Sequence, residues 1–512
     1  MRGTGMKYSN GIRITFFIIV FALLVSGSNH DPASNQLPEN IWPTATPEEQ
    51  GIDSKQLIRV FDFVQQNNVN IHSILLIRNG YLVLEAYFYP NSRGIVHDVA
   101  SVTKSITSIL TGIAMDKGCI KDIAQPVLDF FPDRRIANLD ARKKRLTIEH
   151  LLTMRTGFCR NFEQGERQLD EMRQTGDWAQ YMLDQPLLSE PGTEFAYCTG
   201  GTHLLSALLA KATGMNELEF ARKNLFGPLG IDDVIWPMDP QGNNTGGFDL
   251  HVHPIDLAKV GFLLLNDGVW NGNRIVSKKW INGSTQNPVK LDDGELYGYL
   301  WWSPNENPDL VEGRGRGGQR LIFSRQRHIV LVFTGSGFNP GDIGAVLLPA
   351  IRSDKPLPEN PGARELLRQK IAEAMAGPEP KPMPNLPSIA SEISGKTFEF
   401  EPNPKGWISF SLSFDGSPEA SFALVEKNNK EVNRIGLDGR YRVSNNRPYG
   451  LPEALKGSWI SDREFALLYN EFANNHLYRI TFSFPFDKNI AKIHCVENTG
   501  LLDMTVIARM SK

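Results

Sequence analysis

The sequence predicts an α+β fold followed by a separate antiparallel β domain, and three observations support this prediction. An amphipathic segment near the N-terminus precedes two apolar runs joined at Asn79-Gly80. Strand-like runs return after a long, mostly helical region, in "LYGYLWW", "GQRLIFSRQ" and "HIVLVFTGS". From about residue 388, short alternating runs such as "ISFSLSF" and "LYRITFSFPF" are separated by turns, which is typical of antiparallel sheet.

The first elements predict a helix packed on a β-hairpin. Leu57, Val60, Phe61 and Val64 recur at helical spacing, which indicates one apolar helix face. Asn79-Gly80 supplies the positive φ angles of a type I′ turn, so the apolar runs on either side of it predict two paired strands.

A second helix is predicted in "SVTKSITSILTGIAMDKG", residues 101–118. The apolar residues between Val102 and Ile113 form one stripe, and Gly118 suits the C-terminal end of the helix. A region of helices and loops, punctuated by Gly and Pro, then runs to about residue 285.

The first 28 residues have the layout of a signal peptide. Arg2, Lys7 and Arg13 precede an apolar run at 14–25, and small residues follow this run. The run is shorter than the ~20 residues that a membrane span needs. We therefore expect export to the periplasm or the outside and no stable membrane span after signal removal, with an uncleaved N-terminal anchor as the alternative.

The rest of the chain divides into three predicted segments. Residues 40–355 are assigned to the α+β domain, and residues 388–512 to the all-β domain. Between them, 361–387 is expected to hold a helix at 361–375 and then a stiff Pro-rich linker, "PEPKPMPNLP".

Composition argues against several classes of partner. The 54 basic and 57 acidic residues are interspersed, and the net charge is -3; nucleic-acid binders usually carry a basic stripe, so no nucleic-acid partner is expected. The four cysteines fit no zinc spacing, and His251 and His253 have no third ligand at a suitable spacing. We therefore expect neither a metal nor a cofactor. The oligomeric state is not indicated.

Ser101 and Lys104 stand at i and i+3 in the first turn of the predicted helix, so their side chains can meet. A serine hydroxyl becomes a nucleophile only with a neighbouring base, and a lysine can be that base where burial lowers its pKa. The alternative is a helix cap with a solvated lysine, and the short motif alone does not decide between them.

Further motifs follow the Ser-x-x-Lys pair in a fixed order. They are "LLTMRTG" (151–157), "EPGTEFAYCTGGTHLLSALLAKATG" (190–214), "LFGPLGI" (225–231), "HPIDLAKVGFLLLNDGVWNG" (253–272), "YGYLWW" (297–302) and "GRGGQ" (315–319). Together they resemble the serine β-lactamase-like family, which includes class C β-lactamases, D-Ala-D-Ala carboxypeptidases, esterases and amide hydrolases. The resemblance covers about residues 45–350 and implies a β-lactamase/transpeptidase-like domain, in which helices flank an antiparallel sheet beside a helical region.

The resemblance implies Ser101, Lys104 and Tyr197 as the catalytic residues of an acyl transfer. Tyr197 occupies the tyrosine position of the family's Tyr-x-Asn motif, and either Lys104 or Tyr197 could be the resting base. Thr199 departs from the usual Asn. Its hydroxyl could still hydrogen-bond Lys104, and we place it among the substrate-binding residues.

The family's third motif, Lys-Thr-Gly or His-x-Gly, matches Arg316-Gly317-Gly318. Arginine cannot act as a base, so the implied role of Arg316 is to stabilise a deprotonated Tyr197 or to bind an acidic group of the substrate. The glycines would let substrate approach an edge strand. The implied oxyanion hole combines the backbone N–H groups of Ser101 and Gln319.

Cys159 and Cys198 lie on segments that face the active site in the resembled family. The resemblance therefore implies a Cys159–Cys198 disulfide. A catalytic cysteine is disfavoured, because no histidine forms a recognisable pair with either residue.

The sequence thus predicts an exported serine hydrolase that cleaves an ester, amide or peptide bond of a small molecule through an acyl-enzyme on Ser101. The alternative is a non-catalytic protein of the same fold that binds ligands or senses penicillin. The β domain could shape the cleft, mediate self-association or only pack against the hydrolase.

Overall fold

The computed structural model describes residues 42–286, 289–383, 385–427 and 429–511. The predicted signal peptide, 1–28, lies outside these ranges. Within them, every helix is too short or too polar to cross a membrane.

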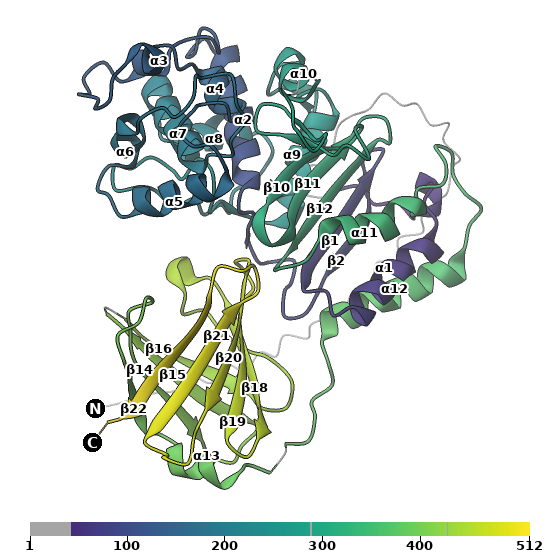
Figure 1. Ribbon diagram of the computed structural model, residues 1–512. Coiled ribbons are helices and arrows are strands. Elements are labelled where there is room, and N and C mark those ends of the chain that lie inside the picture. Colours follow the sequence, from purple (N-terminus) through teal and green to yellow (C-terminus); the bar gives the residue numbers. More distant parts are fainter. Residues whose placement is uncertain (1–41, 287–288, 384, 428, 512) are drawn as a thin grey trace, which may run out of the picture. The chain divides into compact units, whose positions relative to one another are not determined.

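An eight-stranded antiparallel sheet forms the centre of the first domain (Figure 1). Its strand order is β2-β1-β12-β11-β10-β9-β8-β7. Asn79 and Gly80 have φ angles of 50° and 84° in the turn between β1 and β2, so the predicted hairpin is confirmed. The strands are β1 (Ile71–Arg78), β2 (Tyr81–Tyr87), β7 (Val289–Lys290), β8 (Leu296–Tyr297), β9 (Trp302–Ser303), β10 (Val311–Gly315), β11 (Gln319–Ser324) and β12 (Ile329–Gly335).

Helices cover both faces of this sheet. On one face lie α1 (Ser54–Gln66), α11 (Pro340–Leu347) and α12 (Pro361–Ala376), whose apolar side chains share a core with β1 and β12. On the other face lie α9 (Pro254–Leu265) and α2 (Val102–Asp116). α2 therefore lies between the sheet and the helical region, which places its N-terminus beside strand β10.

The helical region packs around α2 and α7. Its core is apolar and continuous with one face of the sheet, as the sequence predicts for a domain in which helices flank a sheet. Its helices are α3 (Ala141–Lys144), α4 (Ile148–Leu152), α5 (Phe162–Arg173), α6 (Trp178–Asp184), α7 (Thr199–Thr213) and α8 (Glu217–Ala221).

The run "LYGYLWW" is not one strand, as the sequence suggested. It forms two short strands, β8 and β9, on either side of Leu300, whose φ is 64°. The backbone of Leu300 bonds to the helical region instead of a neighbouring strand: its N–H donates to Leu152 and its carbonyl accepts from the Ser105 hydroxyl.

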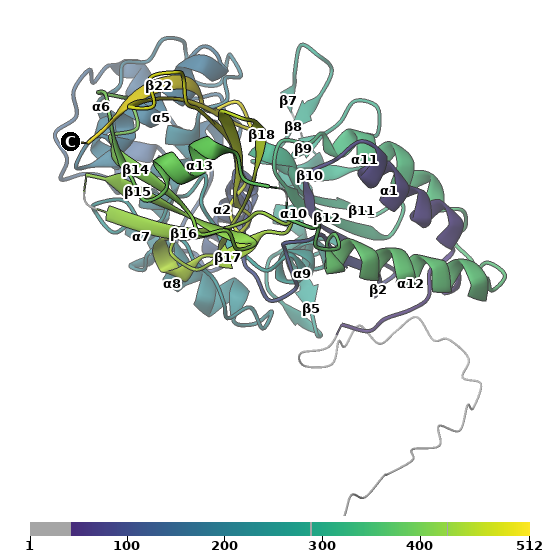
Figure 2. The same ribbon diagram turned by 90° about the horizontal axis from the view of Figure 1, so that it is seen from below.

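The C-terminal domain is an antiparallel barrel (Figure 2). Its strands follow one another in space nearly as in the chain, and contacts of β16 with β18 and of β13 with β22 close the ring. The strands are β13 (Thr397–Phe400), β14 (Trp407–Phe414), β15 (Glu419–Glu426), β16 (Asn429–Gly436), β17 (Arg442–Ser444), β18 (Glu453–Ser461), β19 (Glu464–Glu471), β20 (His476–Ser483), β21 (Ile490–Glu497) and β22 (Asp503–Met510).

The barrel has its own apolar core, which is rich in phenylalanine. The turn between β19 and β20, residues 472–475, contacts the hydrolase domain through hydrogen bonds. Ala473 accepts one from the backbone of Asp98, and a small apolar cluster joins Ala473 to Val96 and Leu451. This turn brings barrel residues to the segment that precedes Ser101.

Candidate active site

Ser101 stands at the N-cap position of α2, yet its side chain does not cap the helix. Its hydroxyl accepts a hydrogen bond from Lys104 Nζ at 2.9 Å and is also hydrogen-bonded to the phenol of Tyr197. Ser101 is half-buried and Lys104 is fully buried. The three side chains therefore meet in one place, and the interpretation of Ser101 as an ordinary helix cap is wrong.

Lys104 lies in an environment that disfavours its charged form. Its Nζ donates a second hydrogen bond to the carbonyl of Gly247, at 2.7 Å. Burial lowers the pKa of Lys104 to about 7, although the carboxylate of Glu166 acts in the opposite direction. Near pH 7 a large fraction of the amine is therefore unprotonated and available as a base.

Tyr197 precedes α7 and presents its ring to the lysine. Lys104 Nζ lies 4.9 Å from the ring centroid, and the ring of Trp302 stacks on the phenol at 6.1 Å between centroids. Burial raises the pKa of Tyr197 above its ordinary value, so the phenol is protonated at neutral pH. The ring of Phe162, which is exposed, also lies 6.1 Å from the Tyr197 ring between centroids.

The turn before Ser101 is held in a strained conformation. Ala100 has a φ of 46°, which is uncommon for a residue with a side chain. Its N–H donates to Asp98 Oδ1 at 2.7 Å, and the other carboxylate oxygen accepts a hydrogen bond from Asn475 Nδ2 at 2.7 Å. Asp98 thus fixes the backbone directly before Ser101, and a barrel residue, Asn475, fixes Asp98.

Asn475 is a residue of the site that sequence reasoning missed. Besides its bond to Asp98, it accepts a hydrogen bond from Arg316 at 3.3 Å through its side chain and one from the Ser336 hydroxyl at 2.8 Å through its carbonyl. It is fully buried. No local signal in the sequence marks it, because its partners lie more than a hundred positions away.

Thr199 lies beside Lys104 but does not replace the family's asparagine. Its methyl group faces the backbone of Gly247: a Cβ placed on this glycine would lie 3.1 Å from it. Among the described residues, the hydrogen bonds of Lys104 go to Ser101 and Gly247. The possible Thr199–Lys104 hydrogen bond is therefore not formed, since the carbonyl of Gly247 accepts from the lysine in its place. The substrate-binding role of Thr199 stays a prediction.

The Arg316-Gly317-Gly318 segment is the turn between β10 and β11, and it differs from expectation in two ways. β11 is not an edge strand, because it pairs with both β10 and β12. The space above the glycines is filled by protein: a Cβ on Gly318 would lie 2.4 Å from the Phe338 ring, and one on Gly317 would lie 3.1 Å from Asn475 Cβ.

Arg316 is exposed and bonds to Asn475. The arginine that acts on the phenol is Arg320, whose positive charge opposes the rise in the pKa of Tyr197. Arg320 is half-buried and donates to the carbonyl of Gln319 at 2.9 Å. The positive charge that acts on the phenol thus comes from a residue four positions later in the chain, whereas the binding of an acidic substrate group by Arg316 stays a prediction.

The β10–β11 hairpin lies against the turn that precedes Ser101. A Cβ on Gly315 would lie 2.4 Å from the carbonyl oxygen of Val99 and 3.2 Å from Ala100 Cβ. Gln319 pairs with Gly315 in the hairpin. Among the described residues, the N–H of Ser101 donates to no protein group. This geometry is compatible with the predicted oxyanion hole of Ser101 and Gln319, which stays a prediction.

The expected disulfide is absent. Cys159 and Cys198 are both free thiols, as are the other two cysteines. They are hydrogen-bonded to each other, and Cys159 Sγ also lies 3.8 Å from the carbonyl of Tyr197. The two segments do meet, as the resemblance implied, but they are joined by thiol hydrogen bonds instead of a covalent bond.

The histidine pair at 251 and 253 forms no metal centre. His251 contacts Asn474 of the barrel, whereas His253 contacts Asp233. Over the described ranges, no group of three or more His, Cys, Asp or Glu side chains is placed to hold a metal ion.

Comparison with known proteins identifies the family. The sequence profile described as Beta-lactamase matches residues 60–354, more than half of the chain. The 6-aminohexanoate-dimer hydrolase of Paenarthrobacter ureafaciens is 27% identical over 296 residues, which are 52% of this chain and 73% of that protein. Monacolin J acid methylbutanoyltransferase of Aspergillus terreus is 29% identical over 160 residues, 27% of this chain and only 38% of that protein.

The chain can also be superposed on solved structures. A putative 6-aminohexanoate-dimer hydrolase from Bacillus anthracis has a TM-score of 0.49 at 17% identity, over 66% of this chain and 87% of that chain. An octameric penicillin-binding protein homologue from Pyrococcus abyssi has a TM-score of 0.47 at 17% identity, over 89% of this chain and 99% of that chain. The match of the family profile over more than half of the sequence is decisive: the chain belongs to the beta-lactamase family of serine hydrolases.

Proposed function

We propose that this protein is an exported serine hydrolase that cleaves an ester or an open-chain amide through an acyl-enzyme on Ser101. One observation carries the proposal. The Ser101 hydroxyl at the start of α2 contacts a buried lysine at 2.9 Å and the Tyr197 phenol, although a serine in this position would ordinarily cap its helix.

The first half of the reaction would form the acyl-enzyme. Lys104 accepts the proton of Ser101 as the oxygen attacks the carbonyl carbon, which gives a tetrahedral intermediate. Its oxyanion would be stabilised by the N–H groups of Ser101 and Gln319. The protonated phenol of Tyr197 would donate a proton to the leaving amine or alcohol, and the Lys104 ammonium would return a proton to the phenol.

The second half would release the acid. Lys104, neutral again, would take a proton from water as it attacks the ester of Ser101. The serine oxygen then leaves and regains its proton from the lysine. In this scheme Lys104 is the base at rest and Tyr197 the acid, because their pKa values are shifted in opposite directions by the same burial.

Esters and open-chain amides are preferred over β-lactams for two reasons. The relative from Paenarthrobacter ureafaciens is named 6-aminohexanoate-dimer hydrolase, and an amino acid that dimerises through its amine and its carboxyl group forms an open-chain amide. In addition, Phe162 and Trp302 border the phenol, and these aromatic rings suit an apolar part of a linear substrate.

The decisive test uses a fluorophosphonate probe and p-nitrophenyl esters on the full chain. We expect labelling at Ser101 and turnover, both abolished in Ser101→Ala. The matched control is Ser108→Ala on the same helix, because the buried Ser108 hydroxyl has no hydrogen-bond partner among the described residues. A ligand that still binds Ser101→Ala, with no labelling of the wild type, would instead support the non-catalytic alternative.

A substrate panel then assigns the class. Linear ω-amino-acid amides, D-amino-acid amides, short esters and nitrocefin should be ranked by kcat/KM, and we expect nitrocefin to be the poorest. Export is tested separately by fractionating cells and sequencing the N-terminus of the mature chain. A chain that begins near Ser28 or Asn29 in an exported fraction is the expected result, and an intact N-terminus in the cytoplasmic fraction would contradict it.

A further inference from the structure

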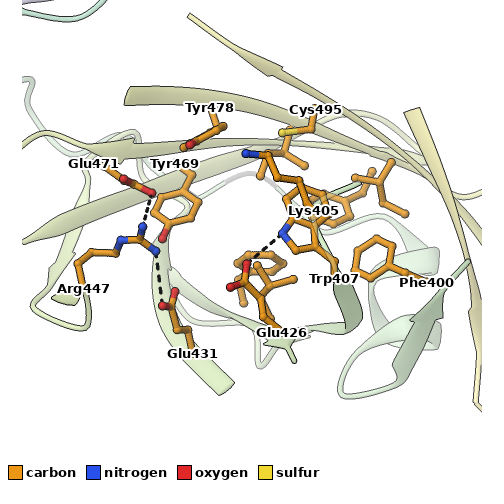
Figure 3. A pocket seen from close by; sticks show the side chains of 15 residues that line it. Phe400, Lys405, Trp407, Glu426, Glu431, Arg447, Tyr469, Glu471, Tyr478 and Cys495 are labelled. Atoms are coloured by element: carbon orange, nitrogen blue, oxygen red, sulfur yellow. Dashed lines mark hydrogen bonds and ion pairs between the residues drawn. The ribbon is translucent and has the colours of Figure 1, made fainter. Parts of the chain in front are cut away.

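The barrel contains a cavity of about 150 Å³ that the hydrolase chemistry does not use. It is lined from the ends of several strands that share one rim, including β13, β14, β15, β19 and β21 (Figure 3). A space of about 150 Å³ accommodates a molecule of benzene size. The cavity therefore fits a ligand with a short apolar body.

One part of the cavity wall is apolar. Aromatic and aliphatic side chains from neighbouring strands contribute to it: Phe400, Phe422, Leu424, Ile480, Phe482 and Ile493. The indole of Trp407 is part of the wall, and its N–H donates to Glu426 at 3.1 Å (Figure 3). Because this donor is already bonded, the wall offers a ligand mainly aromatic and aliphatic surface.

The other part of the wall carries an excess of negative charge. Arg447 lies 3.2 Å from Glu471, 3.5 Å from Glu431 and 4.0 Å from Glu453. The three carboxylates are almost fully buried, with 5%, 12% and 0% of their side chains exposed. The lining itself has three acidic residues (Glu426, Glu431 and Glu471) and two basic ones (Lys405 and Arg447), a formal excess of one negative charge. Glu453 does not line the cavity but adds a further buried carboxylate beside Arg447, in a region of low dielectric constant.

The fold relieves this excess only in part. Tyr469, which lines the cavity, donates its hydroxyl to Glu453, and Asn429 donates to Glu431. Burial and the neighbouring carboxylates Glu426 and Glu471 raise the pKa of Glu431. A positively charged ligand would balance the negative charge that these neutral donors leave, which is costly to bury.

An anionic ligand fits this cavity less well. Arg447 is already surrounded by carboxylates, and the other basic residue of the lining, Lys405, is exposed. An anion bound by Lys405 would gain little, because water screens the charge of this exposed lysine. An anion placed at Arg447 would be repelled by the carboxylates of Glu431 and Glu471.

We propose that the barrel cavity is a second binding site, which takes a small organic ammonium ion with an apolar body. The ammonium group would lie against Glu431 and Glu471, and the apolar body against the aromatic wall around Phe422 and Phe482. The site is built entirely from barrel residues and is independent of catalysis at Ser101.

The test is isothermal titration of the full-length Ser101→Ala protein with three probes of one size: n-hexylammonium, hexanoate and 1-hexanol. The Ser101→Ala background prevents reaction at the active site. We expect hexylammonium to bind with a stoichiometry of one and at least about tenfold more tightly than either of the others, as expected for a charge-assisted contact.

Two variants locate the binding. Glu431→Gln removes one charge and should weaken hexylammonium about tenfold, and Leu424→Trp should abolish binding by filling the cavity. The control is Glu464→Gln, because Glu464 is at the opposite end of β19 from Glu471 and does not line the cavity. Tighter binding of hexanoate, no binding of any probe, or equal effects of Glu431→Gln and Glu464→Gln would each overturn the proposal.

Discussion

Asn475 donates a hydrogen bond to the carboxylate of Asp98 across 2.7 Å, and this bond joins two residues that are 377 positions apart. Asp98 in turn accepts the N–H of Ala100, the strained residue directly before Ser101. The barrel therefore takes part in holding the turn that presents Ser101, the proposed nucleophile. Of the three roles that the sequence left open for this domain, the hydrogen bonds favour shaping of the active site.

Replacing Asn475 by alanine should lower kcat about tenfold and change KM less. The reason is that Asp98 loses a charge-assisted donor, so that the conformation of Ala100, and with it the direction of the Ser101 hydroxyl, is less well fixed. The measurement is kcat and KM for a p-nitrophenyl ester, together with the rate of fluorophosphonate labelling.

Asn498→Ala is the control for this variant. Asn498 also joins the barrel to the hydrolase domain, through a bond to the carbonyl of Ser336 at 2.8 Å, but it does not contact Asp98. We expect it to affect stability without a comparable fall in labelling rate. If Asn475→Ala changed only the melting temperature, the residue would have no positioning role.

The rate should depend on pH through Lys104. With a pKa lowered to about 7 by burial, the amine is protonated and inactive below this value and neutral above it. The kcat/KM for an uncharged ester should therefore rise with pH and level off above about pH 8. Lys104→Arg, which keeps the charge but cannot give up its proton, should lose ~10²–10⁴-fold, the usual contribution of a general base.

The pH profile also has an outcome that would contradict the assignment of the base. A rate that keeps rising to an inflection near pH 10 would mean that the lysine titrates as it does in water. In that case the burial of Lys104 would not produce a base at neutral pH, and another group would have to accept the Ser101 proton.

Thr199→Val should leave activity within about threefold of the wild type. The threonine methyl packs against Gly247 and valine retains this methyl, whereas the Lys104 amine is held by Ser101 and the Gly247 carbonyl. The measurement is kcat/KM for the same ester at pH 8. A tenfold loss would show instead that the hydroxyl has taken over the role of the family's asparagine.

The sequence predicted the parts of the site that lie in motifs and missed those that depend on tertiary contact. Ser101, Lys104 and Tyr197 were found because the order of the motifs fixes their positions, and the structure brings them together. Gly247 could not be found, because its contribution is a backbone carbonyl, which no side-chain motif marks.

The fold, too, was predicted correctly where local sequence patterns determine it and incorrectly where tertiary contacts do. The hairpin at Asn79-Gly80 and the alternating strands of the barrel follow from local patterns, and both are present. The edge-strand position of β11 and the pairing of Cys159 with Cys198 depended on the resemblance, and both were wrong in this chain. The barrel residue Asn475 lies in the turn between β19 and β20, whose sequence matches no motif. Only its contacts in the folded protein show that it belongs to the site.

Glu217→Gln should stabilise the protein at alkaline pH and have little effect at acidic pH. Glu217 is fully buried, and burial raises its pKa from 4.5 to about 7, although the hydroxyls of Ser206 and Thr107 act in the opposite direction. The folded state therefore binds more protons than the unfolded state between these two values. It follows that the stability contributed by this group is present below about pH 4.5 and is lost as the pH rises through about 7.

The size of this effect follows from the shift. A pKa that is about 2.5 units higher in the folded than in the unfolded state corresponds to roughly 3 kcal/mol of unfolding free energy, which the wild type loses at pH 8.5. Glutamine is neutral at every pH, so the variant does not lose this stability. Urea unfolding of wild type and variant at pH 5 and pH 8.5 measures it, with Glu194→Gln, an exposed carboxylate, as the control. A stability difference that is the same at both pH values would mean that Glu217 does not change its protonation on folding.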